Sequence, residues 1–293
     1  MIAPSASTLS PQLPTPQSVS SLRRMDDSSR GPISTLGRAV LNFINYFGQL
    51  GILLGEGFES LVKTKPRLHL MMEQIVRIGF GSQVVVIVTG AFTGAVFTAQ
   101  SYFKFRDFGI ESTVGSIVSV SLFRELGPVL TGLMVAGRVG AAMAAEIGTM
   151  KVSEQIDALR AMGVHPVDYL AMPRFFAMTI SMPLLIAEAV AFGLGASLFV
   201  AVLGFGIPSA WFWMHTIDNT NLEDLSYAMI KGLVFGMLIV VISCHQGLST
   251  TNGAVGVGQS TTRAVVFSSL ALLVTNFFLT LLLNYIFPMG TIT

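Results

Sequence analysis

The sequence predicts an all-α integral membrane protein with five transmembrane helices, an N-terminal amphipathic helix at the membrane interface and a short cytoplasmic helix between spans two and three. Two observations predict this class. Hydrophobic residues make up 52% of the 293 residues and charged residues only 11%, with a mean hydropathy of +0.69, which leaves too little polar surface to cover a soluble globule. Five apolar runs also reach the length that a helix needs to cross a bilayer.

The first 32 residues are rich in Ser and Pro and contain no apolar run. Such a segment cannot bury enough surface to offset chain entropy, so we expect a disordered tail. It lacks the hydrophobic region of a signal peptide. Its Ser and Arg content leaves an organelle transit sequence open, although Asp26 and Asp27 count against one.

Residues 36–62 carry apolar side chains at helical spacing, with polar residues on the other faces. We expect a helix lying in the plane of the membrane interface. A sixth span is the alternative, which Glu56, Glu59 and several glycines disfavour. Pro66 ends the helix because the residue before a proline is excluded from helical geometry.

Five segments are apolar and long enough to span the membrane. They are residues 84–103, 126–147, 175–205, 228–244 and 264–287. The third is too long for one straight crossing, so we expect it to tilt or to extend beyond the bilayer. An odd number of spans places the two ends of the chain on opposite sides.

Lys and Arg residues gather on one side of the predicted spans. They precede the first span, occupy the loop between spans two and three and precede span five, whereas the 206–226 loop has none. Basic residues mark cytoplasmic loops. The sequence therefore predicts a cytoplasmic N-terminus and an external C-terminus.

Charged residues interrupt the second span at Arg124, Glu125, Arg138 and Glu146. Charges at membrane depth are expensive and usually face a partner or a pathway. For Arg124 and Glu125 the structural alternative is anchoring at the membrane interface, and adjacent residues on a helix point about 100° apart, so they need not pair. For Arg138 and Glu146 the structural alternative is a buried network within a dimer.

Small residues stand four apart in three spans, at Gly90 and Gly94, at Ala136 and Gly140, and at Gly232 and Gly236. Such faces let helix backbones approach closely. The pattern predicts tight helix packing, with the partner helix in either the same chain or a second copy.

The segment 149–162 follows the second span and repeats apolar residues at near-helical spacing. Gly163 supplies a left-handed stop and Pro166 prevents the helix from resuming. The segment is either a passive connector on the membrane surface or a docking helix, because an apolar ridge rimmed by charge fits a groove on a partner.

The run Gly253-Ala-Val-Gly-Val-Gly-Gln-Ser260 comes close to a phosphate-binding loop. Gln259 stands where that loop needs its lysine, so we expect no nucleotide site on this chain. The alternative is a glycine-rich cytoplasmic turn whose following residues cap the fifth span.

Other site chemistries find no support in the sequence. The net charge of +1 argues against nucleic-acid binding. The four histidines lie in separate segments and Cys244 is the single cysteine, so we expect no metal site. His245 has no nearby carboxylate to orient it, and we expect no catalytic residues.

Two motif blocks bear a resemblance to a known family. The run RELGPVLTGLMVAGRVGAAMAAEIGTMKVSEQIDAL from Arg124 to Leu159, with Pro173-Arg174, and GAVGVGQSTTRAVV from Gly253 to Val266 resemble the MlaE/YrbE family, the permease subunits of Mce-associated ABC lipid transporters. The resemblance implies that residues 33–293 form one permease domain in a bacterial inner membrane, or alternatively in an organelle inner envelope.

The same resemblance implies partners and site residues. We expect a homodimer, ABC ATPase subunits that hold ATP and Mg, an Mce-domain substrate-binding protein and membrane phospholipid as the cargo, with no cofactor on this chain. The implied lipid cavity lies near Arg124, Glu125 and Arg138. The implied coupling helix, which seats on the ATPase, comprises Glu146, Gly148, Thr149, Lys151, Glu154, Gln155, Asp157 and Leu159. The cytoplasmic glycine-rich loop comprises Gly253, Gly256, Gly258, Thr261, Thr262 and Arg263.

Two other functional classes remain open from the sequence. An ATP-independent secondary carrier or channel would often show paired repeats, and the five spans contain no internal duplication. A membrane-embedded lipid-modifying enzyme is the second alternative.

Overall fold

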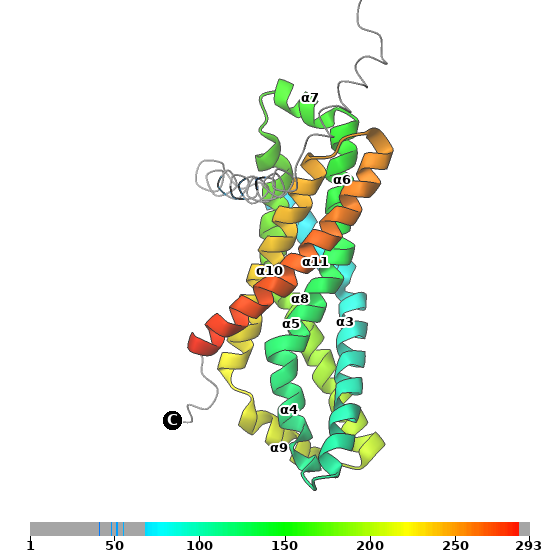
Figure 1. Ribbon diagram of the computed structural model, residues 1–293, viewed down its shortest axis with the longest axis vertical. Helices are drawn as coiled ribbons and strands as arrows, with labels where there is room; N and C mark the ends of the chain where they lie inside the picture. The colour runs from blue at the N-terminus through cyan, green and yellow to red at the C-terminus, as the bar shows by residue number, and fades with distance from the viewer. Residues whose placement is uncertain (1–40, 42–47, 49–50, 52–54, 56–67, 287–293) are drawn as a thin grey trace, which may run out of the picture. The chain divides into compact units, whose positions relative to one another are not determined.

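A computed structural model describes residues 68–286, with Leu41, Gly48, Gly51 and Gly55 as isolated further positions. Figure 1 shows the chain, with the other residues as a grey trace. The predicted tail of residues 1–32 and the predicted interfacial helix of residues 36–62 lie outside the described residues.

Residues 68–286 are helical throughout, apart from short connections, and include no strand. The helices are α3 (Leu68–Arg106), α4 (Val114–Ser121), α5 (Gly127–Val135), α6 (Ala141–Val152), α7 (Gln155–Ala161), α8 (Met172–Phe199), α9 (Ser209–Asn219), α10 (Leu222–Leu248) and α11 (Gly253–Ile286). Short π-helical turns occupy Leu122–Leu126, Ala136–Gly140, Val167–Ala171 and Val200–Gly204. A 3₁₀ turn occupies Glu111–Thr113.

Within residues 68–286, five helical segments are long and apolar enough to cross a membrane. They are His69–Arg106, Val114–Val152, Val167–Gly204, Leu222–Leu248 and Gly253–Ile286. The prediction of an all-α protein with five spans is confirmed. The second segment joins α4, α5 and α6 through two π-helical turns into one helical rod.

The predicted bounds of the spans were too short. The second span begins at Val114 instead of residue 126, and the fifth begins at Gly253 instead of residue 264. A hydropathy window counts only the part that suits hydrocarbon, whereas a helix continues through polar flanks because its backbone groups stay paired. The 206–226 loop also contains a helix, α9, which the sequence analysis did not predict.

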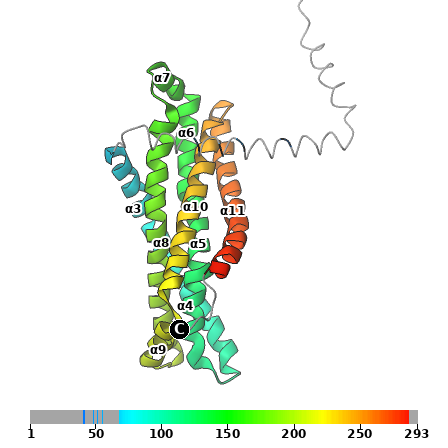
Figure 2. The ribbon, with the colours of Figure 1, turned by 90° about the vertical axis from the view of Figure 1, so that its left-hand side faces the viewer.

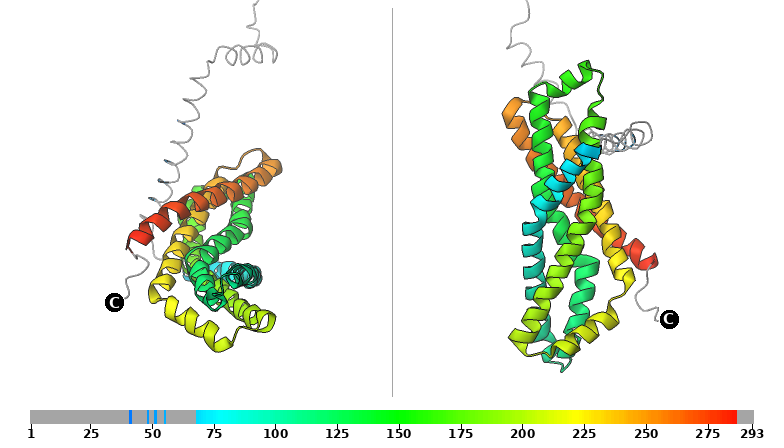
Figure 3. Two further views of the ribbon diagram at one scale, coloured as in Figure 1. Left: turned by 60° about the horizontal axis from the view of Figure 1, so that its bottom comes forward. Right: turned by 180° about the vertical axis from the view of Figure 1, so that it is seen from behind.

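Close backbone contacts hold α3 against α8, as the view from behind in Figure 3 shows. An added Cβ at Gly90 would meet the backbone of Ala189, and one at Gly94 would meet the carbonyl of Gly193. Only a glycine permits this approach. The predicted tight packing is confirmed here, and the partner helix belongs to the same chain.

Helix α10 is the central helix of the described bundle. It packs against α8, α6 and α11, and Figure 2 shows it between α8 and α11. Gly232 and Gly236 face α8, and Gly140 of the second span faces α10. More than half of the apolar window of α10 is buried, whereas α3 and α11 leave most of theirs exposed. Two charged residues of α10, Asp224 and Lys231, are buried and face protein.

Candidate functional site

The first two charged residues of the second span sit in the π-helical turn Leu122–Leu126. Such turns inside α-helices occur frequently at functional sites. Arg124 is buried, and its Nε donates to Oδ1 of Asp224 at 2.5 Å. Asp224 lies in the first turn of α10, where it also closes a capping box with Asn221. The pair thus joins the second span to the start of α10.

Lys231 on α10 has a fully buried side chain, and its ammonium group has three partners. Nζ lies 2.9 Å from Oε1 of Glu125, 2.9 Å from Oγ1 of Thr280 and 2.7 Å from the carbonyl oxygen of Arg124. Pro128 has no N–H to give that carbonyl an α-helical bond. Lys231 therefore satisfies a backbone acceptor that the proline leaves open.

Helix α11 completes this cluster. Asn276 Nδ2 donates to Oε2 of Glu125 at 3.0 Å, and Thr280 donates to Oε1 at 2.9 Å. The ring of Tyr227 lies 4.9 Å from Nζ of Lys231. We call Arg124, Glu125, Asp224 and Lys231 the four-charge network. It holds two positive and two negative groups, so burying it leaves no net charge in the bundle.

Arg138 lies in the second π-helical turn of the same span, Ala136–Gly140. Its NH1 donates to Oγ of Ser82 on α3 at 2.9 Å. Among the described residues it contacts no carboxylate, and its side chain is exposed. Arg138 and Glu146 are not paired within this chain.

Glu146 instead links three helices at the α7 end of the bundle. Arg77 of α3 donates to its Oε1 at 3.1 Å, and Arg174 of α8 lies 3.1 Å from its Oε2. The side chain of Arg174 is only 5% exposed, against 59% for Arg77. We call these three residues the Glu146 triad.

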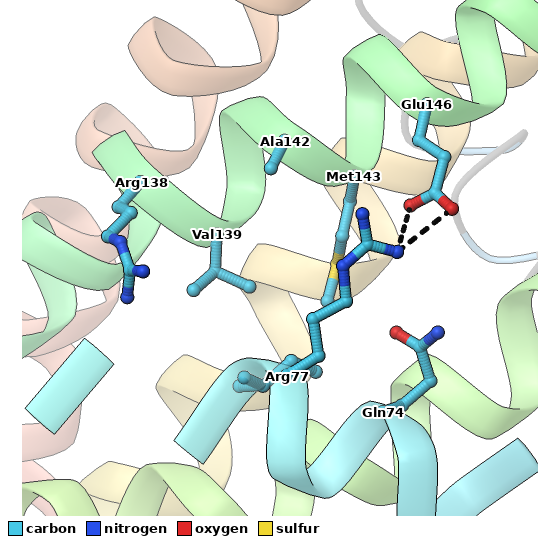
Figure 4. Close-up of a pocket in the computed structure, with 8 residues that line it drawn as sticks. Gln74, Arg77, Arg138, Val139, Ala142, Met143 and Glu146 are labelled. Atoms are coloured by element: carbon cyan, nitrogen blue, oxygen red, sulfur yellow. Dashed lines mark hydrogen bonds and ion pairs between the residues drawn. The ribbon is translucent and has the colours of Figure 1, made fainter. Parts of the chain in front are cut away.

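A cavity of about 130 Å³ lies between α3 and the second span. Figure 4 shows Arg77 reaching from α3 to Glu146, with Arg138 at the other end of the lining residues. Apolar side chains, among them Val139 and Met143, separate the two arginines. The cavity therefore combines two guanidinium groups with an apolar wall.

The second span therefore contributes residues to both the four-charge network and the Glu146 triad. A model of the family described as "Permease MlaE" matches residues 71–282. The chain belongs to the MlaE permease family. The motif-based resemblance is confirmed.

Relatives of this MlaE-family permease come from bacteria and a plant. A probable ABC transporter permease protein of Rickettsia typhi is 40% identical over 248 residues, which cover 85% of this chain and 96% of the relative. The intermembrane phospholipid transport system permease protein MlaE of Haemophilus influenzae is 35% identical, with 85% and 95% covered. The protein TRIGALACTOSYLDIACYLGLYCEROL 1, chloroplastic, of Arabidopsis thaliana is 38% identical, with 78% and 65% covered. The chain is a multi-pass membrane permease.

The predicted coupling helix of this MlaE-family permease needs a correction. Glu146, Gly148, Thr149 and Lys151 are not part of a separate helix, because α6 continues to Val152. The chain turns at Ser153 and Glu154, and α7 begins at Gln155. Glu154 adopts φ +60°, a left-handed conformation that breaks the helix. The predicted left-handed stop at Gly163 is confirmed, with φ +75°.

Most of the apolar ridge of this segment points inward, and only Met162 at its end stays exposed. Ile156 is fully buried in the main core, and Leu159 packs against that core. We define the elbow as residues 152–163. Its exposed surface combines charged side chains with two large apolar ones, Val152 and Met162. Asp157 lies on this surface, between Lys151 at 3.3 Å and Arg160 at 3.1 Å.

The predicted glycine-rich loop is also wrong, because residues 253–263 form the first three turns of α11. The chain reverses earlier, at Asn252 and Gly253, which both have positive φ. Gly256 packs against Thr251 with no room for a Cβ. Thr261 and Thr262 bond to carbonyls four residues back in the helix, so they cap nothing. Arg263 is an exposed residue within the same helix and not at its start.

Several residues of these clusters were not predicted from the sequence to be site residues. Lys231 lies within the predicted fourth span, and a lysine in an apolar run is a signal that could have found it. Arg77 indicated only the orientation of the first span, and Arg174 was part of the Pro173-Arg174 motif; neither was predicted to pair with Glu146. Asp224 and Asn276 carry no local signal, because their partners stand 100 or more residues away in sequence.

Across residues 68–286, no three His, Cys, Asp or Glu side chains gather closely enough to hold a metal ion.

Proposed function

We propose that this protein is the permease subunit of an ABC transporter that moves phospholipid between the inner membrane and an Mce-domain carrier. In this proposal two copies form a homodimer, and separate ATPase subunits bind ATP and Mg²⁺. The chain itself has no catalytic role. The family membership and the printed names of its relatives support the proposal.

One observation carries the mechanism: a single helical rod, Val114–Val152, connects the two charge clusters. The four-charge network contacts this rod nearer its N-terminal end, through Arg124 and Glu125. The Glu146 triad grips it near the other end. A force applied at the α7 end would be transmitted along the rod to the network, because close-packed protein interiors are hard to compress and transmit strain.

The elbow of residues 152–163 is the proposed seat of the ATPase. Its exposed face carries Glu154, Gln155 and Asp157, and Ile156 anchors it to the core. A rigidly anchored, charged elbow would pass motion of a partner into α6. In this proposal the α7 end lies in the cytoplasm, with the N-terminus inside and the C-terminus outside. The Lys and Arg residues near the ends of the spans support this orientation, because basic residues favour cytoplasmic loops.

Lipid release requires an energy input of the size that ATP supplies. Burial of an acyl chain contributes about 0.8 kcal/mol per methylene. An apolar cavity in the dimer, near Arg124 and Glu125, would therefore hold lipid until the rod moves.

The test is charge reversal on the elbow of the complete complex. Glu154→Lys together with Asp157→Lys should abolish ATP-driven lipid transfer in proteoliposomes while the permease remains folded. Glu223→Lys is the matched control, because Glu223 is an exposed carboxylate in the first turn of α10. Unchanged transfer by the double variant would contradict the proposed docking. Vectorial lipid transfer by the isolated chain, without ATPase, would contradict the proposed function.

A further inference from the structure

A second cavity lies at the end of the bundle opposite α7, between the C-terminal end of α3 and the start of α9. Figure 1 shows α7 and α9 at opposite ends. The cavity has a volume of about 340 Å³, within the range of small-ligand sites. Its walls include Tyr102, Glu111, Phe205, Pro208 and Trp211. Neither the four-charge network nor the Glu146 triad contributes to it.

Aromatic rings form much of the wall of this cavity. The rings of Tyr102 and Phe205 stack with centroids 4.1 Å apart and an interplanar angle of 14°. Trp211 lines the same cavity from the first turn of α9. Aromatic faces carry partial negative charge and attract cations, above all ammonium groups.

Glu111 adds a carboxylate that the described chain does not satisfy. Its Oε2 is buried and has no hydrogen-bond donor among residues 68–286. The neighbouring cations Lys104 and Arg106 are exposed and form no ion pair with it. A buried carboxylate oxygen without a donor costs free energy. The missing partner must therefore be a donor that comes from outside the described chain.

The combination of aromatic faces and one carboxylate selects a positively charged donor and repels a phosphate. We propose that this cavity binds the ammonium headgroup of a zwitterionic phospholipid such as phosphatidylethanolamine. The identity of the ligand as a lipid rests on the proposed function. The geometry supports it independently, because exposed Trp211 lines the cavity and exposed Phe103 packs against its wall residues Tyr102 and Phe205. Trp and Tyr are enriched at headgroup level in membrane proteins.

The test compares two lipids that share their acyl chains and phosphate and differ at the headgroup nitrogen, which is a cationic ammonium in one and a neutral amide in the other. The purified full-length chain is mixed with equal amounts of phosphatidylethanolamine and its N-acetylated form, and bound lipids are counted by native mass spectrometry. The wild type should retain the ammonium lipid about tenfold better. Glu111→Gln should bring the ratio close to one, and Trp211→Leu should lower it.

Glu223→Gln is the matched control, since Glu223 is an exposed carboxylate that does not line the cavity. It should leave the ratio unchanged. The proposal would be overturned if the wild-type protein bound both lipids equally, or if Glu111→Gln still preferred the ammonium lipid. Water would then be the donor to Glu111. The lipid proposal would also be overturned if Glu111→Gln lost a co-purified partner subunit while the lipid ratio stayed unchanged. In that case a basic side chain of the partner would be the donor to Glu111.

Soluble O-phosphoethanolamine distinguishes a lipid from a free amine. It should displace the bound lipid only at much higher concentration, and equal potency would overturn the assignment to lipid. All these measurements are made at equilibrium without ATP or ATPase. If the wild-type protein transfers lipid on ATP hydrolysis but shows no headgroup preference, this inference alone is overturned. If it prefers the ammonium lipid but shows no ATP-driven transfer, only the proposed function is overturned.

Discussion

Lys231 and Glu125 form an ion pair of 2.9 Å in which one partner is fully buried and the other is 40% exposed. The buried lysine cannot reach water, so its charge depends on the carboxylate and on the Arg124 carbonyl. Glu125, in contrast, keeps one side open. The pair therefore combines a fixed structural cation with an accessible anion at the point where the second span, α10 and α11 meet.

Replacing Lys231 should destabilise the protein strongly. Lys231→Met removes the buried cation, leaves the Arg124 carbonyl without its side-chain donor and leaves Glu125 with only neutral donors. A buried carbonyl without its donor costs about 1 to 3 kcal/mol, and the lost attraction to the partly exposed carboxylate adds to this cost. Denaturant titration of the protein in detergent can measure the sum. Adding Glu125→Gln should recover part of the loss, because the uncompensated charge disappears.

The matched control for this prediction is Lys104→Met, at an exposed position in the last turn of α3. It should change the free energy of unfolding by less than about 0.5 kcal/mol. A loss in Lys231→Met as small as that of the control would show that the network contributes little to stability.

The contact between α3 and α8 predicts opposite effects for two glycine substitutions. A Cβ at Gly94 would collide with the Gly193 backbone, whereas one at Gly195 meets nothing within 4 Å. Gly94→Ala should destabilise by about 1 to 3 kcal/mol through overpacking. Gly195→Ala should stabilise by about 0.5 to 1 kcal/mol, because alanine is the better helix former. Thermal unfolding of both variants in one detergent checks the order, and similar midpoints would contradict the packing argument.

The Glu146 triad predicts unequal effects for its two arginines. Arg174 is 5% exposed, so Arg174→Gln should remove a buried charged hydrogen bond to Glu146 and cost about 1.5 to 3 kcal/mol. Arg77 is mostly exposed, and Arg77→Gln should cost only about 0 to 1 kcal/mol. Unfolding in detergent at low and high salt separates the two, since only the exposed pair should weaken with salt. Equal losses in the two variants would show that burial does not set their contributions.

Much of the fold is readable from the sequence. The five spans follow from hydropathy, because transfer of about 20 apolar residues into hydrocarbon depends on the local sequence alone. The stop at Gly163 follows from the rarity of left-handed geometry in other residues. The motif from Arg124 to Leu159 was sufficient for the family.

The tertiary structure decided what those residues contact. Whether Arg138 would pair with Glu146 could not be read from their spacing, and the fold gives Glu146 to Arg77 and Arg174 instead. The break at Glu154 and the early start of α11 at Gly253 depend on packing of Ile156 and Gly256.

Local patterns thus determined which segments enter the membrane and roughly where they end. They did not determine the partners of the charges inside it, because Arg124 meets Asp224, and Glu125 meets Lys231 and Asn276, only after distant helices pack together. The free energy of such a pair depends on burial and geometry, and only the assembled bundle sets both.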